Sequence, residues 1–169
     1  MAEIADKVPV EDKWAFATNV FSGSAMGLMA QLVGALGKEK VIEILNGMWG
    51  GGGAALHPMI QQKYNIPVED AAGAARLSLV VGKVALGPEY TSEIVESTPE
   101  RAVRRTYKCA LWERAKEYNV LDAFEVCGEP CAKFVEEGFK AVNPKIDFKL
   151  TKCPEWGDEY CEFLYEFKK

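Results

Sequence analysis

The chain has 169 residues, of which 49% are hydrophobic and 27% charged, and its formal net charge is −5 at pH 7. This length suits one domain with a substantial core. We therefore expect a single domain over residues 1–169, with a helical lobe over about 1–87 and an α+β, cysteine-containing lobe over about 88–169. The acidic balance excludes a nucleic-acid-binding protein of the usual basic kind.

The first six residues are acidic rather than basic, unlike the start of a secretory signal peptide. Without such a signal, the five cysteines of the chain are expected to be reduced, as thiols are in the cytosol. We therefore predict a cytoplasmic protein.

Residues 14–37 contain no charged side chain, so a membrane span has to be considered. Five polar side chains, from Thr18 to Gln31, would then lie in the hydrocarbon at a cost. We therefore predict no membrane span. We expect a buried helix that packs in the core or joins two copies of the chain in a homodimer. The apolar side chains that suit such burial are Phe21, Met29, Leu32, Val33 and Leu36.

A second helix is predicted from Lys38, and four glycines at 50–53 interrupt it, because glycine carries a high entropic cost inside a helix. No Gly-Lys-Ser/Thr follows, so this is not a phosphate loop. We favour a flexible break or a tight helix crossing over a close backbone approach to a ligand.

The helix resumes over residues 54–64, where His57, the only histidine, precedes Pro58. A lone histidine usually has a structural role or is exposed. Yet histidine alone has an unperturbed pKa that suits acid–base work near neutral pH, so His57 is a candidate catalytic residue.

A third helix is predicted over residues 68–86, followed by two strands over 90–97 and 101–109. A further helix continues over 110–118. Cys109 opens that helix, and it is a core residue, a spare metal ligand or a nucleophile.

Three arginines, Arg101, Arg104 and Arg105, cluster on the second strand. The favoured interpretation is that they are solvated charges facing Glu93 and Glu96 across the hairpin. The alternative is that they bind a carboxylate ligand.

The C-terminal part begins with a helix, because Pro130 suits a first helical position and Asn143-Pro144 ends the pattern. Two alternating stretches, 146–151 and 161–167, then predict a hairpin that brings Cys153 and Cys161 together. The order of helices, hairpin, helices and hairpin predicts an α+β fold: a helical N-terminal half plus an antiparallel sheet built from two hairpins.

Four cysteines gather in this part: Cys127, Cys131, Cys153 and Cys161. Four thiolates could hold zinc in a tetrahedron or, alternatively, an iron–sulfur cluster. Cys131 falls in the first turn of a helix, where backbone N–H groups favour a thiolate. The alternative is that the cysteines are reduced and pack as small hydrophobic residues.

The same residues carry a resemblance. The run Lys152-Cys153-Pro154-Glu155-Trp156-Gly157-Asp158 with Cys161-Glu162-Phe163, preceded by Cys109, Cys127 and Cys131, resembles the L-2-amino-thiazoline-4-carboxylate hydrolase-like family. It also resembles the related vinyl-reductase-type ligand-binding domains. The likeness covers roughly residues 100–169 well, and it implies the same α+β arrangement.

In phenol-sensing regulators with such a domain, cysteines and a glutamate hold a zinc near this hairpin. The resemblance therefore implies zinc ligands at Cys127, Cys153 and Cys161. The glutamate has no match, since Leu150 stands three residues before Cys153. Cys131 would be the fourth ligand in its place.

Two functions follow as expectations. The first is a metal-binding domain for a small apolar or aromatic molecule, a sensor or a carrier. The alternative is a hydrolase of a small cyclic C–N substrate, which would use a metal-activated water or a cysteine nucleophile. A closed four-thiolate zinc has no position for water, which favours the first. The side chains expected to line the pocket, where they are not simply core, are Trp14, Phe16, Met26, Met29, Met48, Trp49 and Trp112.

Overall fold

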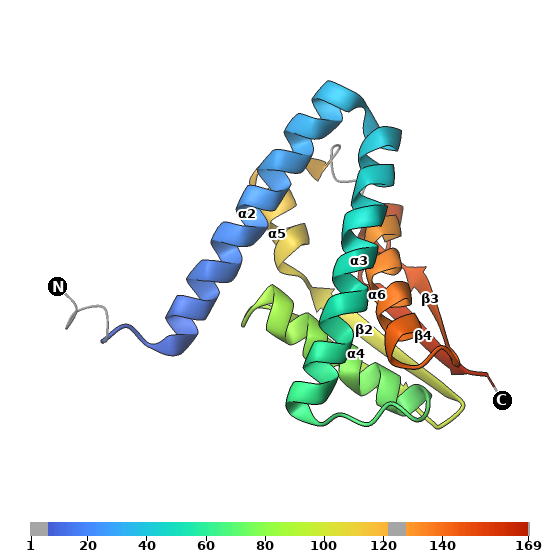
Figure 1. The fold of residues 1–169 in the computed structure, drawn as a ribbon. Helices are drawn as coiled ribbons and strands as arrows, with labels where there is room; N and C mark the ends of the chain where they lie inside the picture. Colours follow the sequence, from blue (N-terminus) through green and yellow to red (C-terminus); the bar gives the residue numbers. More distant parts are fainter. Residues whose placement is uncertain (1–6, 122–127, 169) are drawn as a thin grey trace.

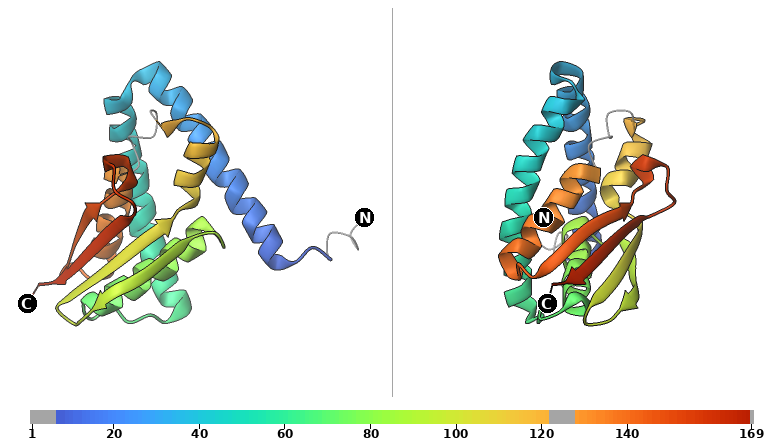
Figure 2. Two further views of the ribbon diagram at one scale, coloured as in Figure 1. Left: turned by 180° about the vertical axis from the view of Figure 1, so that it is seen from behind. Right: turned by 90° about the vertical axis from the view of Figure 1, so that its right-hand side faces the viewer.

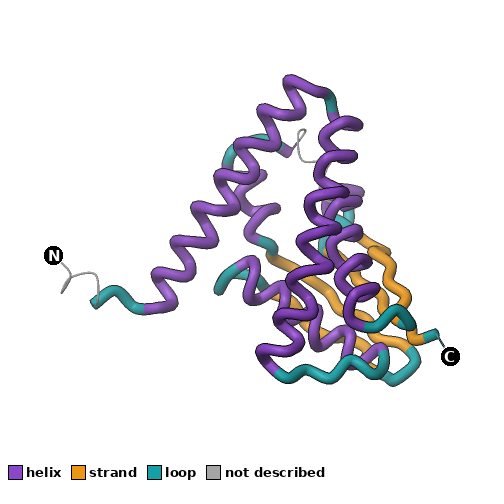
Figure 3. The backbone as a smooth tube through the Cα atoms, in the orientation of Figure 1, coloured by secondary structure: helices purple, strands orange, loops and turns teal. Residues whose placement is uncertain are grey.

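The computed structural model describes residues 7–121 and 128–168. Helices and strands segregate as an α+β fold requires, which confirms the predicted class (Figures 1 and 3). The elements, in chain order, are α2 (Val10–Leu36), α3 (Lys38–Tyr64), α4 (Ala71–Leu86), β1 (Thr91–Ser97), β2 (Arg101–Lys108), α5 (Ala110–Glu117), α6 (Gly128–Val142), β3 (Ile146–Lys152), the 3-10 turn η2 (Pro154–Trp156) and β4 (Cys161–Phe167).

The four strands form one antiparallel sheet in the order β1-β2-β4-β3. Each predicted hairpin is therefore present, and the two are joined by pairing of β2 with β4. Helices α4 and α6 pack on the sheet, and α3 packs on them, so these three helices all lie on one side of it (Figure 2). The face of β2 and β4 that carries Arg104, Phe163 and Tyr165 is consequently interior.

Helix α2 leans away from the body of the molecule toward its N-terminal end (Figure 1). Gly37, with φ 79°, makes the single-residue turn that joins it to α3. Only a narrow face of α2 is buried, around Ser22 and Met26, while Phe21 is 63% exposed. The expectation of a mostly buried helix is thus wrong, because α2 contacts the body along one side alone.

Among the described residues, α2 is also the helix whose length and apolar content would allow it to cross a membrane. The apolar window is 22% buried. One such helix is weak evidence, since the buried core helix of a soluble protein and a signal sequence near the N-terminus pass the same test. The absence of a membrane span and the cytoplasmic location both stay predictions.

Helix α3 runs unbroken through the four glycines, so the predicted interruption at 50–53 is wrong. The tight crossing expected there is confirmed. A β-carbon at Gly53 would lie 1.9 Å from the carbonyl oxygen of Phe134 in α6. Each glycine costs a helix about 1 kcal/mol relative to alanine, and the close packing of α6 at Gly50 and Gly53 offsets this cost.

Two apolar clusters form the core. The first joins α4, α6 and the sheet around Leu77, Phe139 and Tyr165. The second joins α2, α3 and α5 around Met26 and Leu45.

Candidate ligand-binding cavity

A cavity of about 630 Å³ lies where the two apolar clusters meet. Met29 and Leu45 of the second cluster line one part of it, and Val81 and Val135 of the first line another. Helices α2 to α6, strand β2 and the β3–β4 hairpin all contribute to the wall. Its volume falls within the roughly 300–1,000 Å³ of pockets that bind small molecules.

The wall is mainly apolar, as a pocket for an apolar or aromatic molecule should be. The pocket residues expected from the sequence divide into two groups. Met29, Met48, Trp49 and Trp112 line the cavity, whereas Trp14, Phe16 and Met26 are outside its wall.

The main polar feature of the wall is the buried side chain of Arg104, which is 2% exposed. Its hydrogen bonds run to neutral hydroxyl groups that come from three strands and from the residue before β1. The two N–H groups of Nη1 are shared among the hydroxyls of Tyr90, Ser92 at 3.0 Å and Thr106 at 2.6 Å, and Nε donates to that of Tyr165 at 3.4 Å.

The charge of Arg104 is held against an aromatic ring. The guanidinium carbon lies 3.9 Å from the centre of the Phe163 ring, opposite it in the β2–β4 register. Burial lowers the pKa of Arg104, but the nearby phenol oxygens of Tyr165 and Tyr90 raise it by more, so the side chain stays charged. Among residues 7–121 and 128–168, no carboxylate forms an ion pair with it.

The two neighbouring arginines differ from Arg104. Arg101 pairs with Glu96 across the hairpin, as predicted, and Arg105 Nε lies 2.9 Å from Glu162 Oε2 of β4. The expectation of solvated strand charges is wrong for Arg104, because successive side chains of a strand point to opposite faces. Arg101 and Arg105 share the outer face, and Arg104 points inward.

His57 is fully buried in α3 and also lines the cavity. Its Nδ1 lies 3.0 Å from the carbonyl oxygen of Gly53, so Nδ1 carries the proton and Nε2 is an acceptor. Nε2 has no hydrogen-bond partner among the described residues. Burial lowers the pKa of His57 to about 4, against the raising effect of the Gly53 carbonyl and with a further lowering by Arg104. The ring is therefore neutral at pH 7.

The four described cysteines all line the same cavity. Burial raises the pKa of Cys131 to about 12, and the neighbouring Cys109 and Cys153 add to it. In the chain without a metal ion, burial outweighs the N-terminus of α6, so the Cys131 thiol is protonated at pH 7. A thiolate at Cys131 stays a prediction that depends on the metal. Burial likewise raises the pKa of Cys109.

Cys153 and Cys161 are adjacent, as the predicted hairpin requires. A hydrogen bond from the Cys161 thiol lowers the pKa of Cys153. The turn between them is fixed by Asp158, whose carboxylate accepts from the Cys153 backbone N–H at 2.9 Å. Glu155 Oε2 in turn accepts from the backbone N–H of Gly128 at 2.5 Å, which ties this turn to the start of α6.

The predicted metal ligands are only partly brought together. In the part of the chain that the structure describes, no group of three His, Cys, Asp or Glu side chains is placed to hold a metal ion. Cys127 lies outside the described residues. The pair Cys153 and Cys161 alone does not complete a tetrahedral site, so the zinc or iron–sulfur site stays a prediction that requires Cys127.

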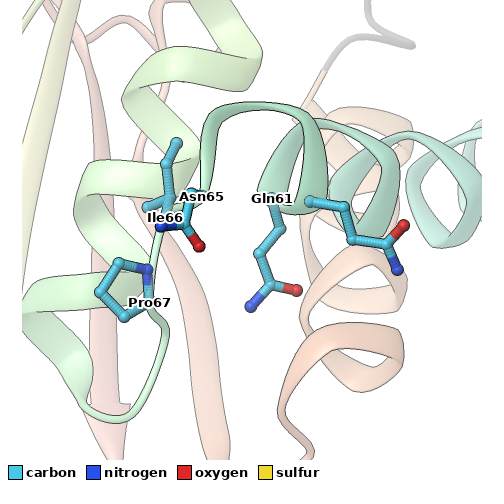
Figure 4. A pocket seen from close by; sticks show the side chains of 5 residues that line it. Gln61, Asn65, Ile66 and Pro67 are labelled. Atoms are coloured by element: carbon cyan, nitrogen blue, oxygen red, sulfur yellow. The ribbon is translucent and has the colours of Figure 1, made fainter.

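A second depression, of about 400 Å³, lies at the end of α3 beside Gln61, Asn65 and Pro67 (Figure 4). It is lined by amide and apolar side chains and contains no ionisable group or thiol. It therefore offers no chemistry comparable to that of the cavity.

Sequence reasoning missed the hydroxyl groups around Arg104. Tyr90, Ser92 and Thr106 lie within the predicted hairpin, and Ser78 Oγ accepts from Tyr165 at 2.6 Å. These hydroxyl groups come together only because β1 pairs with β2 and α4 packs on the sheet. The alternation of residues 102–106 was the available signal, since it puts Arg104 on the same face as two small or hydroxyl side chains, Ala102 and Thr106.

No protein-family model matches the chain, and no curated protein matches it. Several solved structures share its fold, including the following two. One is a trafficking protein particle complex subunit 3 from Naegleria fowleri covalently bound to palmitic acid, with a TM-score of 0.61 and 14% identity over 92% of this chain and 97% of that one. The other is the phenol-responsive sensory domain of the transcription activator PoxR with phenol, with a TM-score of 0.58 and 12% identity over 86% of this chain and 74% of that one.

At these identities the likeness shows the fold alone. It supports the part of the sequence resemblance that implied a small α+β fold of the kind found in ligand-binding domains. No family match confirms the L-2-amino-thiazoline-4-carboxylate hydrolase-like family itself.

Proposed function

We propose that the chain is a small-molecule-binding domain of the sensory or carrier type, whose ligand is an apolar or aromatic molecule that occupies the cavity. The observation that carries this proposal is the cavity of about 630 Å³ between the two apolar clusters. Two proteins of similar fold, one bound to palmitic acid and one to phenol by their descriptions, support it.

The chemistry of the wall supports an apolar ligand. Trp49, Trp112 and Phe134 present aromatic surface, and Met29 and Met48 present flexible thioethers. Neutral His57 adds one hydrogen-bond acceptor at Nε2. Burial of apolar ligand surface in such a site contributes about 25 cal/mol per Å² before the costs of association.

A matched pair of glycine substitutions tests the proposal. Gly52 lines the cavity, and Gly51 has open space beside its α-carbon. A neutral dye that fluoresces in apolar surroundings, N-phenyl-1-naphthylamine, is titrated into the parent, Gly52→Leu and Gly51→Leu. We expect saturable binding to the parent and to Gly51→Leu, and at least about tenfold weaker binding to Gly52→Leu. Equal binding to the two variants, or none to the parent, would contradict the proposal.

We infer as a separate step that a metal, zinc or alternatively an iron–sulfur cluster, is held by Cys127, Cys131, Cys153 and Cys161. The adjacency of Cys153 and Cys161, and the place of Cys131 on the same cavity, support it. Zinc bound there would supply cross-linking rather than chemistry, since four thiolates close the tetrahedron.

Hydrolysis of a cyclic C–N substrate has no specific observation in its favour among the described residues. The pKa values of Cys131, raised by burial to about 12, and of His57, lowered by burial to about 4, both lie far from neutral. We therefore favour binding over catalysis.

A further inference from the structure

Arg104 is a buried cation whose described partners are all neutral. Taking a charged side chain out of water is unfavourable unless the charge is paired. The outward-facing Arg101 and Arg105 of the same strand both have glutamate partners, although water already solvates them. Arg104 is buried, so an anionic partner would stabilise it more than the other two, yet it has none among residues 7–121 and 128–168.

The guanidinium also has donor capacity to spare. Its hydrogen bonds within the described residues use Nε and Nη1, and Nη2 makes none. Because Arg104 lines the cavity, an acceptor on a bound molecule can reach it. Tyr90 and Thr106 line the cavity beside it, and hydroxyl groups can rotate to donate to an anion.

We propose that the ligand is an amphipathic monocarboxylate: its carboxylate binds Arg104 with support from the hydroxyls of Tyr90 and Thr106, and its apolar body fills the rest of the cavity. This step rests on the proposed function and names its ligand class. A planar carboxylate matches the fork of a guanidinium. Of the described residues on the wall, the other cation is Lys108, which lies 3.6 Å from Glu89. The described wall therefore offers one unpaired positive charge and suits a single negative one.

The contribution of the carboxylate to affinity is measured with pairs of molecules that have the same apolar body and differ only in having a carboxylate or a hydroxyl group. Dodecanoate and 1-dodecanol, and 4-phenylbutyrate and 4-phenylbutanol, are each used to displace bound N-phenyl-1-naphthylamine. The first pair represents fatty acids and the second aromatic acids. We expect the parent to bind at least one acid about 10- to 100-fold more tightly than its alcohol, as a charge-assisted hydrogen bond would give.

Three variants locate the preference. In Arg104→Gln the acid and the alcohol are expected to bind equally, while the neutral dye still binds. Arg105→Gln removes the same charge from the outer face of the same strand, and it should keep the full preference. If Arg104→Gln does not fold, Tyr90→Phe decides instead. It removes one hydroxyl from the site and should lower the preference several-fold.

The outcomes separate the two proposals. If the dye binds the parent and each alcohol binds it as tightly as the matching acid, the carboxylate site is overturned and the binding function still stands. A preference for the acid that survives in Arg104→Gln, or in Tyr90→Phe where that variant decides, would also overturn it. If neither the dye nor any of the four molecules binds the parent, the proposed function itself fails.

Discussion

At the crossing of α3 and α6, a β-carbon on Gly53 would lie 1.9 Å from the carbonyl oxygen of Phe134. The obstacle is backbone, which cannot rotate away as a side chain can. We predict that Gly53→Ala destabilises the protein by about 2–3 kcal/mol, because the two helices have to separate. Urea unfolding measures this difference.

Gly51→Ala is the matched control. It lies in the same run, and a β-carbon there meets nothing within 4 Å. The exchange removes a glycine from a helix interior, so we expect a gain of up to about 1 kcal/mol. Equal effects of the two substitutions would mean that α3 and α6 do not cross so closely.

His57 predicts a pH dependence of stability. Burial lowers its pKa to about 4 in the folded protein, against the usual 6.5. The unfolded chain therefore binds a proton that the folded one excludes. Stability is complete above pH 6.5 and falls as the pH drops toward 4, with about 2 kcal/mol lost by pH 5.

The variant His57→Asn tests this dependence, since an amide can still donate to the Gly53 carbonyl but does not titrate. Its free energy of unfolding should fall less between about pH 7 and pH 5 than that of the parent, by roughly 2 kcal/mol. A loss of the same size in both proteins would show that other groups cause it.

The metal prediction is tested by elemental analysis of protein purified without oxygen. We expect one zinc per chain, or iron with visible absorption if the site holds a cluster. Cys161→Ser should lose the metal and expose the turn after Cys153 to protease. Strand β4 itself should stay folded, because it lies between β2 and β3. Folded parent protein with neither metal would rule the site out.

The exposed apolar face of α2 predicts self-association. Phe16 is 72% exposed and Val20 is 52% exposed, and such a face is usually covered by a partner. We expect light scattering to give the mass of two 18.7 kDa chains, and Phe16→Glu with Val20→Glu to give the mass of one. Met59→Glu, at an exposed methionine of α3, is the control and should leave the dimer intact. A parent monomer would contradict the interface.

The strands and the C-terminal hairpin could be predicted from the sequence because their signal is local. Alternation along β4 is enough to place Phe163 and Tyr165 inward. The pairing of Arg101 with Glu96 also follows from the hairpin alone.

The unbroken α3 and the buried Arg104 could not be predicted in the same way. The helix continues through glycines 50–53 because α6, some 80 residues later, packs closely against Gly50 and Gly53. Arg104 differs from Arg105 only in the face of the strand, and α4 and β4 decide which face is interior. Both depend on contacts between distant parts of the chain.

The central claim is that the cavity binds one small apolar molecule. Calorimetric titration of the folded parent with N-phenyl-1-naphthylamine at several temperatures tests it most directly. We predict saturation at one molecule per chain and a negative heat-capacity change, which marks burial of apolar surface. Heats that do not saturate, or a saturable site that persists unchanged in Gly52→Leu, would contradict the claim.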